Sequence, residues 1–163
     1  MRGAAVPGAQ RPQAWRPLGE PEIFVPLTDV GRCVGEFSIT WNHPLGMWLM
    51  LHNCPRGIWA RIAPAPWGPW STPTEILSTD DGVACHLIMT PDGCDKRRDF
   101  WPNKHKNGKF VAGGFYAPYV LNRYTSAAAS NGSGRRSVIY WVVSSWNPYE
   151  VSVMRTVLQS NER

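Results

Sequence analysis

The sequence predicts an all-β fold built from antiparallel strands. Glycine and proline, 15 of each in 163 residues, interrupt nearly every window in which a long helix could form. Hydrophobic residues make up 43% of the chain, which is enough to fill a core and excludes a chain that is disordered throughout. Short runs of apolar or alternating residues lie between turn-forming residues, as is typical of β-strands.

Four short strands are expected between residues 36 and 77. The first, 36–41, alternates apolar and polar side chains, whereas the second, 47–51, is apolar throughout, as in a strand that is covered on both faces. The third and fourth are expected at 57–62 and 74–77, separated by a turn rich in proline and tryptophan. This spacing predicts one antiparallel sheet.

A second set of strands is expected between residues 115 and 158. The first, 115–124, contains Pro118, which predicts a special or partly unpaired position because proline cannot donate to a ladder. A buried strand at 137–144 and another at 151–158 follow, after a low-complexity segment at 125–134 that predicts a flexible turn.

The remaining segments are expected to be irregular. Residues 1–21 are rich in proline, glycine and arginine and predict a disordered tail without the apolar stretch of a signal peptide. Residues 78–112 form an insertion that is too long for an ordinary connection, and such loops are often functional. Within it only 83–89 is strand-like, and 159–163 is a C-terminal tail. No run is long enough to span a membrane.

Charge and cysteine content narrow the classes of partner. The net charge of +5 is spread over several loops without a recognisable nucleic-acid-binding module, so no nucleic-acid partner is expected. None of the four cysteines forms a C-x-x-C pair, and neither a metal site nor a cofactor is predicted. Four cysteines allow three disulfide connectivities, and Cys85 and Cys94 could staple a loop in an oxidising compartment.

Two architectures are compatible with these strands, a β-sandwich and a β-propeller with four-stranded blades. The propeller is favoured because both sets share an internal order. Each has an aromatic-rich first strand, a doubly apolar second strand and an amphipathic third strand, with turns between them.

Five segments in the right order give the sequence a resemblance to domain-of-unknown-function family 4185. They are Gly35–Leu51, Gly57–Arg61, Ala65–Ser71, Phe115–Tyr119, and Ser145–Tyr149 with Met154–Thr156. The resemblance covers about residues 22–158 and is weak across 78–112. It implies a secreted five-bladed propeller that acts on glycans. Some members are endo-acting D-arabinofuranosidases of glycoside hydrolase family 183, and the blade pattern is also similar to families 43 and 62.

The resemblance makes Glu36 the candidate general acid, because related propellers place that acid at the start of an innermost strand. The alternative is that Glu36 only accepts a hydrogen bond from a neighbouring backbone amide. Hydrolysis needs a second carboxylate, and Asp29, Asp80 and Asp81 are candidates, although each is typical of a turn. Phe115 stands where many members carry glutamate, which puts a second local carboxylate in doubt.

Sugar binding needs flat aromatic faces and polar groups beside them. The candidates are Trp41, Tyr116 and Tyr119 for stacking, and Asn42, His86 and Arg123 for hydrogen bonds. Trp41 could equally be a core residue, and His86 could be a histidine that packs in the core. The other tryptophans are expected to pack between blades, because they alternate with apolar neighbours: Trp48, Trp59, Trp67, Trp70 and Trp141.

Three functions follow as hypotheses. The first is a hydrolase of furanoside-containing polysaccharides, and the second is a glycan-binding propeller without catalysis. The third is an interaction scaffold, which would expose an apolar patch. Without the tail at 1–21 and the insertion at 78–112, 107 residues remain, which is little more than two blades at roughly 40–50 residues each. The sequence therefore predicts an incomplete propeller of about two to three blades over 22–158. Its unpaired faces favour self-association. The family is extracellular, but without a signal peptide the location of this chain stays open.

Overall fold

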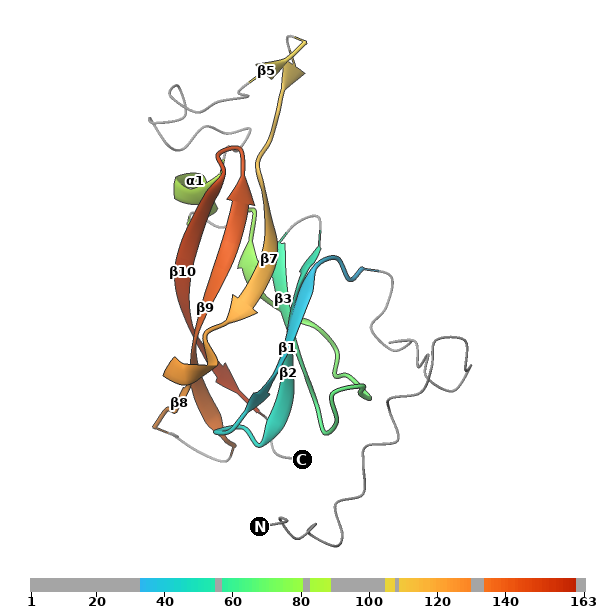
Figure 1. Ribbon diagram of the computed structural model, residues 1–163, viewed down its shortest axis with the longest axis vertical. Coiled ribbons are helices and arrows are strands. Elements are labelled where there is room, and N and C mark those ends of the chain that lie inside the picture. Colours follow the sequence, from blue (N-terminus) through green and yellow to red (C-terminus); the bar gives the residue numbers. More distant parts are fainter. Residues whose placement is uncertain are drawn as a thin grey trace, which may run out of the picture.

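The computed structural model describes residues 33–54, 57–80, 83–88, 105–107, 109–129 and 134–160. They form an all-β protein with antiparallel four-stranded sheets and almost no helix (Figure 1). No helix among these residues has the length and apolar character needed to cross a membrane. The predicted fold class is therefore confirmed at the level of antiparallel β-sheets.

The first sheet is a meander of four consecutive strands. They are β1 (Phe37–Asn42), β2 (Met47–Cys54), β3 (Gly57–Ala63) and β4 (Thr74–Ser78), hydrogen-bonded in the order β1-β2-β3-β4. All four strands were predicted, because alternation along a strand follows directly from its two faces.

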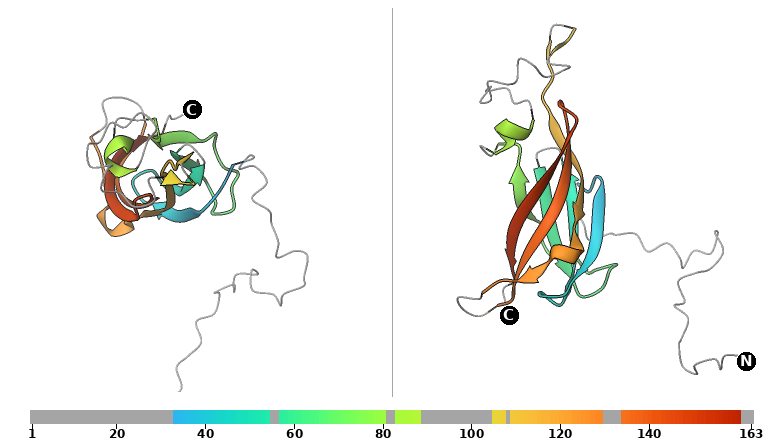
Figure 2. Two further views of the ribbon diagram at one scale, coloured as in Figure 1. Left: turned by 90° about the horizontal axis from the view of Figure 1, so that it is seen from above. Right: turned by 60° about the vertical axis from the view of Figure 1, so that its left-hand side comes forward.

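The second sheet has the order β10-β9-β7, with a short strand β8 also paired to β9. Its strands are β7 (Gly114–Val120), β8 (Ser126–Ala127), β9 (Arg136–Trp146) and β10 (Glu150–Gln159). A separate hairpin of β5 (His105–Lys106) and β6 (Lys109–Phe110) precedes β7. The strands of both sheets run along the long axis of the molecule (Figure 2).

The main hydrophobic core lies between the two sheets. Its members come from β2, β3 and β4 on one side and from β7 and β9 on the other, together with Ala84 of a short helix and Ile88 directly after that helix. The fully buried ones include Leu49, Leu51, Ile58, Ile139 and Trp141. Burying a large apolar side chain stabilises a fold by roughly 1.5–3 kcal/mol, so this shared core joins the sheets into one body.

β7 is the strand of the second sheet that packs against β1 and β2 (Figure 1). Its pairing with β9 shifts between Tyr116 and Tyr119, so that Ala117 and Pro118 fall outside the ladder. Ala117 has a φ of 48°, which is unusual for a residue other than glycine. The special position predicted from Pro118 is thus confirmed as a β-bulge.

Three local predictions were wrong or incomplete. The strand expected at 83–89 is instead a short helix, α1 (Ala84–Leu87), because Ala84 and Ile88, four residues apart, both reach the core. The strand expected at 115–124 ends at Val120, and a turn of 3₁₀ helix follows at Asn122–Tyr124. The segment 125–134, expected to be a flexible turn, contributes strand β8.

The tryptophans and cysteines also differ from expectation. Trp70 and Trp141 are buried, as predicted, but Trp67 is 67% exposed, so its predicted place in the core is wrong. Trp67 and Trp70 lie in the same irregular segment after β3, but only Trp70 packs on the first sheet. Among the described residues the disulfide joins Cys33 and Cys54. Cys94 lies outside the described residues, so the predicted Cys85–Cys94 staple stays a prediction. The tail at 1–21 and much of the insertion also lie outside them.

The outer face of the second sheet exposes a row of apolar side chains. Val151 and Val153 on β10 are 68% and 65% exposed, and Val157 follows on the same face. Val142 of β9 lies beside Val153 and is partly buried. An exposed apolar face is the feature expected of an interaction scaffold.

A buried polar pair occupies the outer face of the first sheet. His52 on β2 and Arg61 on β3 are 1% and 6% exposed. The Nε–H group of Arg61 donates to Nε2 of His52 at 3.3 Å, and Nη1 donates to the carbonyl of Ser71 at 3.0 Å. Burial is the main effect on His52 and lowers its pKa below 6.5. A backbone hydrogen bond with Asn53 raises the pKa of His52, and the nearby charge of Arg61 lowers it, so the net shift is downward.

The lowered pKa of His52 makes stability depend on pH. The unfolded chain takes up a proton near pH 6.5, whereas the folded chain takes it up only at a lower pH. The free energy of unfolding should therefore fall as the pH decreases from about 7 to about 5. His52→Gln keeps an acceptor for Arg61 and should make this slope shallower in urea unfolding curves. An unchanged slope would show that His52 does not carry the effect.

Candidate functional site

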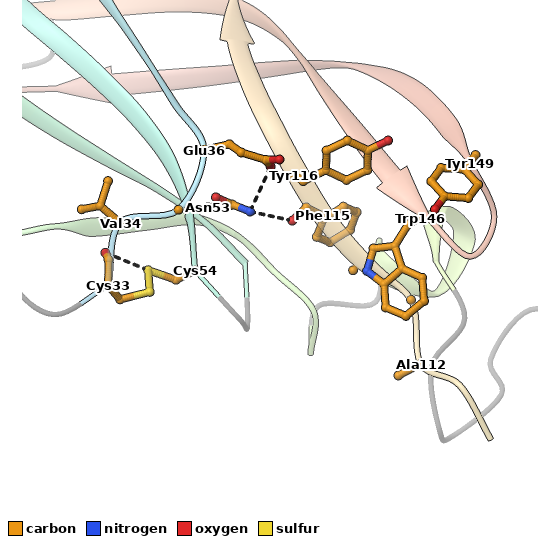
Figure 3. Close-up of a pocket in the computed structure, with 13 residues that line it drawn as sticks. Cys33, Val34, Glu36, Asn53, Cys54, Ala112, Phe115, Tyr116, Trp146 and Tyr149 are labelled. Carbon is orange, nitrogen blue, oxygen red and sulfur yellow. Dashed lines mark hydrogen bonds between the residues drawn. A yellow bond between two sulfur atoms is a disulfide. The ribbon is translucent and has the colours of Figure 1, made fainter. Parts of the chain in front are cut away.

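A pocket of about 930 Å³ opens where the beginnings of β1 and β7 meet the end of β2 and the β9–β10 turn (Figure 3). Its walls come from four parts of the chain: Cys33–Glu36, Asn53 and Cys54, Ala112–Tyr116, and Trp146 with Tyr149. Volumes of this size suit small-molecule or oligomeric ligands, which are bound by apolar walls with a few polar groups.

Glu36 projects into this pocket and contacts the second sheet. Its Oε2 atom accepts a hydrogen bond of 3.0 Å from the backbone N–H of Ala117. The bulge in β7 makes this contact possible, because it turns the Ala117 N–H away from the ladder with β9. Glu36 itself is exposed, so a carboxylate that ties the two sheets together is also open to a ligand.

Asn53 forms the second polar contact of Glu36. Its Nδ2 atom donates to Oε2 of Glu36 at 3.4 Å and to the carbonyl of Phe115 at 3.3 Å. Its Oδ1 atom is buried and has no hydrogen-bond partner among the described residues. An acceptor in that situation is costly unless something donates to it. Asn53 therefore adds an unsatisfied polar atom beside the carboxylate of Glu36.

Aromatic rings occupy the other side of the pocket. Trp146 is 38% exposed and Tyr149 is 73% exposed, and Tyr116 lies between them and Glu36 (Figure 3). Trp146 pairs across the sheet with Gly114, where a Cβ atom would lie only 2.6 Å from the indole Nε1. Glycine at this position allows the indole to lie against the backbone of β7.

Hydrogen bonds of Asn147 and Ser145 fix the β9–β10 turn, which holds these rings. Asn147 is buried, with a φ of 56°, and its Nδ2 atom donates to the carbonyl of Val111 at 2.6 Å. The hydroxyl of Ser145 donates to the carbonyl of Pro148 at 3.0 Å. These contacts position Trp146 and Tyr149 before any ligand arrives, which reduces the entropy lost on binding.

The structure brings two of the predicted site residues together, Glu36 and Tyr116. Trp41 is partly buried, packs edge-on against Trp48 and donates its indole N–H to His43. Asn42 is fully buried. Its side-chain amide is satisfied there, because Nδ2 donates to the hydroxyl of Ser137 and Oδ1 accepts from the N–H of Leu45. Neither Trp41 nor Asn42 lines the pocket.

The other predicted residues lie elsewhere on the surface. Tyr119 is 61% exposed on β7 beyond the bulge. Arg123 is exposed in the 3₁₀ turn, and His86 is exposed on α1. None of the three lines the pocket that contains Glu36.

Three pocket residues escaped prediction: Asn53, Trp146 and Tyr149. Trp146 and Tyr149 belong to Ser145–Tyr149, one of the segments that carry the family resemblance, but no binding role was predicted for either residue. Their aromatic character next to proline was the available signal. Asn53 had none, because its role depends on the pairing of β1 with β2 and on the approach of β7.

Glu36 is the only acidic residue that lines the pocket in the described part of the chain. Glu75 lines a different cleft, and Asp80 lies in the turn after β4, where its backbone N–H donates to the hydroxyl of Ser78. Asp29 and Asp81 are outside the described residues. Nor do the described residues contain a group of three or more side chains that could hold a metal ion.

Comparison with known proteins agrees with the resemblance found in the sequence. The family model described as "Domain of unknown function (DUF4185)" matches residues 10–155, which is most of the chain. No curated protein matches. The match includes the first sheet, the second sheet up to residue 155 of β10, and every described residue of the pocket. The chain therefore belongs to the DUF4185 family.

Proposed function

We propose that this protein binds a glycan in the pocket between its two sheets. The observation that carries the proposal is the placement of a single carboxylate, Glu36, opposite the exposed rings of Trp146 and Tyr149. Sugar rings have apolar C–H faces that stack on aromatic rings, and hydroxyl groups that donate to carboxylate oxygens. The pocket offers both kinds of contact within one cavity.

The hydrogen bonds of Glu36 support binding by that residue. Within the described part of the chain, Oε2 accepts the bonds from Ala117 and Asn53, and Oε1 accepts none. Oε1 is thus available to a sugar hydroxyl while Oε2 keeps the side chain in place.

The arrangement of the sheets supports a propeller architecture for this site. The first strands of the two sets, β1 and β7, lie next to each other, and later strands follow outward in each sheet. In a β-propeller the first strands of neighbouring blades flank the central channel, where ligands bind. We infer that the two sheets are neighbouring blades and that the pocket belongs to such a channel.

Hydrolysis of a furanoside-containing polysaccharide is the second candidate function, and Glu36 would then be the general acid. The two-carboxylate mechanism places the partner about 5–5.5 Å away in a retaining enzyme and about 6.5–9.5 Å away in an inverting one. Because Glu36 is the one acid of the described pocket lining, the partner would come from a residue outside the described part. Binding needs no such partner.

Removal of the aromatic rings tests the binding proposal. Trp146→Ala and Tyr149→Ala should each weaken binding of furanose-containing polysaccharides by roughly 5–30-fold, because each removes a stacking surface worth about 1–2 kcal/mol. Trp67→Ala is the control, since Trp67 is also an exposed aromatic residue but does not line the pocket. Affinity electrophoresis against a panel of soluble polysaccharides measures the effect. Equal losses in all three variants would contradict the proposal.

Glu36→Gln separates binding from hydrolysis. The amide oxygen of glutamine can still accept the Ala117 N–H, so the pocket should keep its shape. The glycan affinity should fall by no more than about tenfold, because an amide N–H that donates to a sugar hydroxyl replaces the stronger carboxylate acceptor at Oε1. Any hydrolytic activity should fall at least about 100-fold, because a general acid contributes on the order of 10²–10⁴ to the rate. Reducing-end assays measure turnover. Unchanged turnover in this variant would exclude Glu36 as the acid.

A further inference from the structure

The Cys33–Cys54 disulfide forms one wall of the pocket (Figure 3). Both cysteines are partly buried, and they lie beside an open cavity that small thiols can enter. Cys33 precedes Glu36 by three residues, and Cys54 directly follows Asn53. The disulfide therefore connects the two chain segments that hold the polar groups of the pocket.

The backbone around the disulfide explains why the connection matters. The N–H of Gly35 donates to the carbonyl of Asn53 at 3.0 Å, and the N–H of Asn53 donates to the carbonyl of Glu36 at 3.1 Å. These two bonds extend the β1–β2 pairing by one step beyond Phe37. β1 is an edge strand, and the ends of edge strands open locally at low cost unless something fixes them.

Side chains of residues 33–36 contribute few packing contacts that could hold this segment in place. A Cβ atom at Gly35 would lie 2.2 Å from Oδ1 of Asn53, so any other residue would have to displace the Asn53 side chain. Gly35 and Glu36 are both exposed. The covalent bond at Cys33 is thus the strongest attachment of the segment that leads into Glu36.

We propose that the Cys33–Cys54 disulfide is a redox latch that keeps Glu36 docked on the bulge of β7. Reduction would free residues 33–36, break the hydrogen bond from Ala117 to Glu36 and remove the carboxylate from the pocket. As a form of regulation of ligand binding, this inference rests on the proposed glycan-binding function. The latch itself is a property of the fold and can be measured without a ligand.

The chemical step is thiol–disulfide exchange with a dithiol reductant. A thiolate of the reductant attacks one sulfur of the Cys33–Cys54 bond, which breaks, and a mixed disulfide forms. The second thiol of the reductant then displaces the protein sulfur. Two electrons pass to the protein, Cys33 and Cys54 end as thiols, and the dithiol ends as a disulfide.

Hydrogen exchange of the backbone amides tests the latch directly. In the reduced protein, the amides of Ala117, Gly35 and Asn53 should exchange at least about tenfold faster than in the oxidised protein, because local opening releases them. The core amides of Ile139 and Val143 on β9 should keep their protection. The double variant Cys33→Ser/Cys54→Ser should reproduce the reduced pattern without any reductant present.

Two outcomes overturn the inference. Unchanged exchange at Ala117 after reduction would show that Glu36 stays docked without the disulfide. A uniform increase that includes Ile139 would show that the disulfide only stabilises the whole fold. Leu158→Ala, which truncates a core contact in β10 far from the pocket, shows what a general loss of stability does to these amides.

Binding of a soluble arabinofuranose-rich polysaccharide completes the test. A selective rise in exchange together with weaker binding in the reduced protein supports both the latch and the proposed function. The same rise with no binding in either redox state supports the latch and contradicts glycan binding. Leu158→Ala should lower the melting temperature and leave the affinity for this polysaccharide unchanged.

Discussion

The hydrogen bond between the Ala117 N–H and Glu36 Oε2 joins the two sheets at the point where the pocket opens. It exists because β7 carries a bulge at Ala117 and Pro118, which takes one backbone donor out of the ladder with β9. The donor freed in this way is open to an acceptor from the first sheet. Glu36, directly before β1, supplies it, and this contact holds two walls of the pocket together at the edge of the hydrophobic core that joins the sheets.

One carboxylate can therefore serve the fold and a ligand at the same time. Sequence considerations left two interpretations of Glu36 open, an acid in a glycan site and an acceptor for a neighbouring backbone amide. The structure contains the second contact on Oε2 and places the same side chain in the pocket. The two interpretations are compatible, because each uses a different oxygen of the carboxylate. A docked carboxylate is also more rigid, which favours binding.

The strands and the family could be predicted from the sequence, because alternation along a strand and short ordered motifs are local properties. Features that depend on contacts between distant segments could not. The helix at Ala84 forms because Ile88 packs on a core built by other strands, and the aromatic wall at Trp146 forms because Gly114 lies opposite. Asn53 acquires its role only when β7 approaches β2. Of the residues that line the candidate site, the sequence predicted a functional role for only two, Glu36 and Tyr116.

The most direct test is a nuclear magnetic resonance titration of the oxidised protein with a furanose-containing oligosaccharide. If the pocket binds the glycan, the resonances of the Ala117 backbone N–H and the Trp146 indole N–H should shift together with a single affinity. The indole N–H of Trp141, which donates to Thr156 inside the core, should not shift. Shifts confined to other surfaces, or none at either pocket group, would contradict the account.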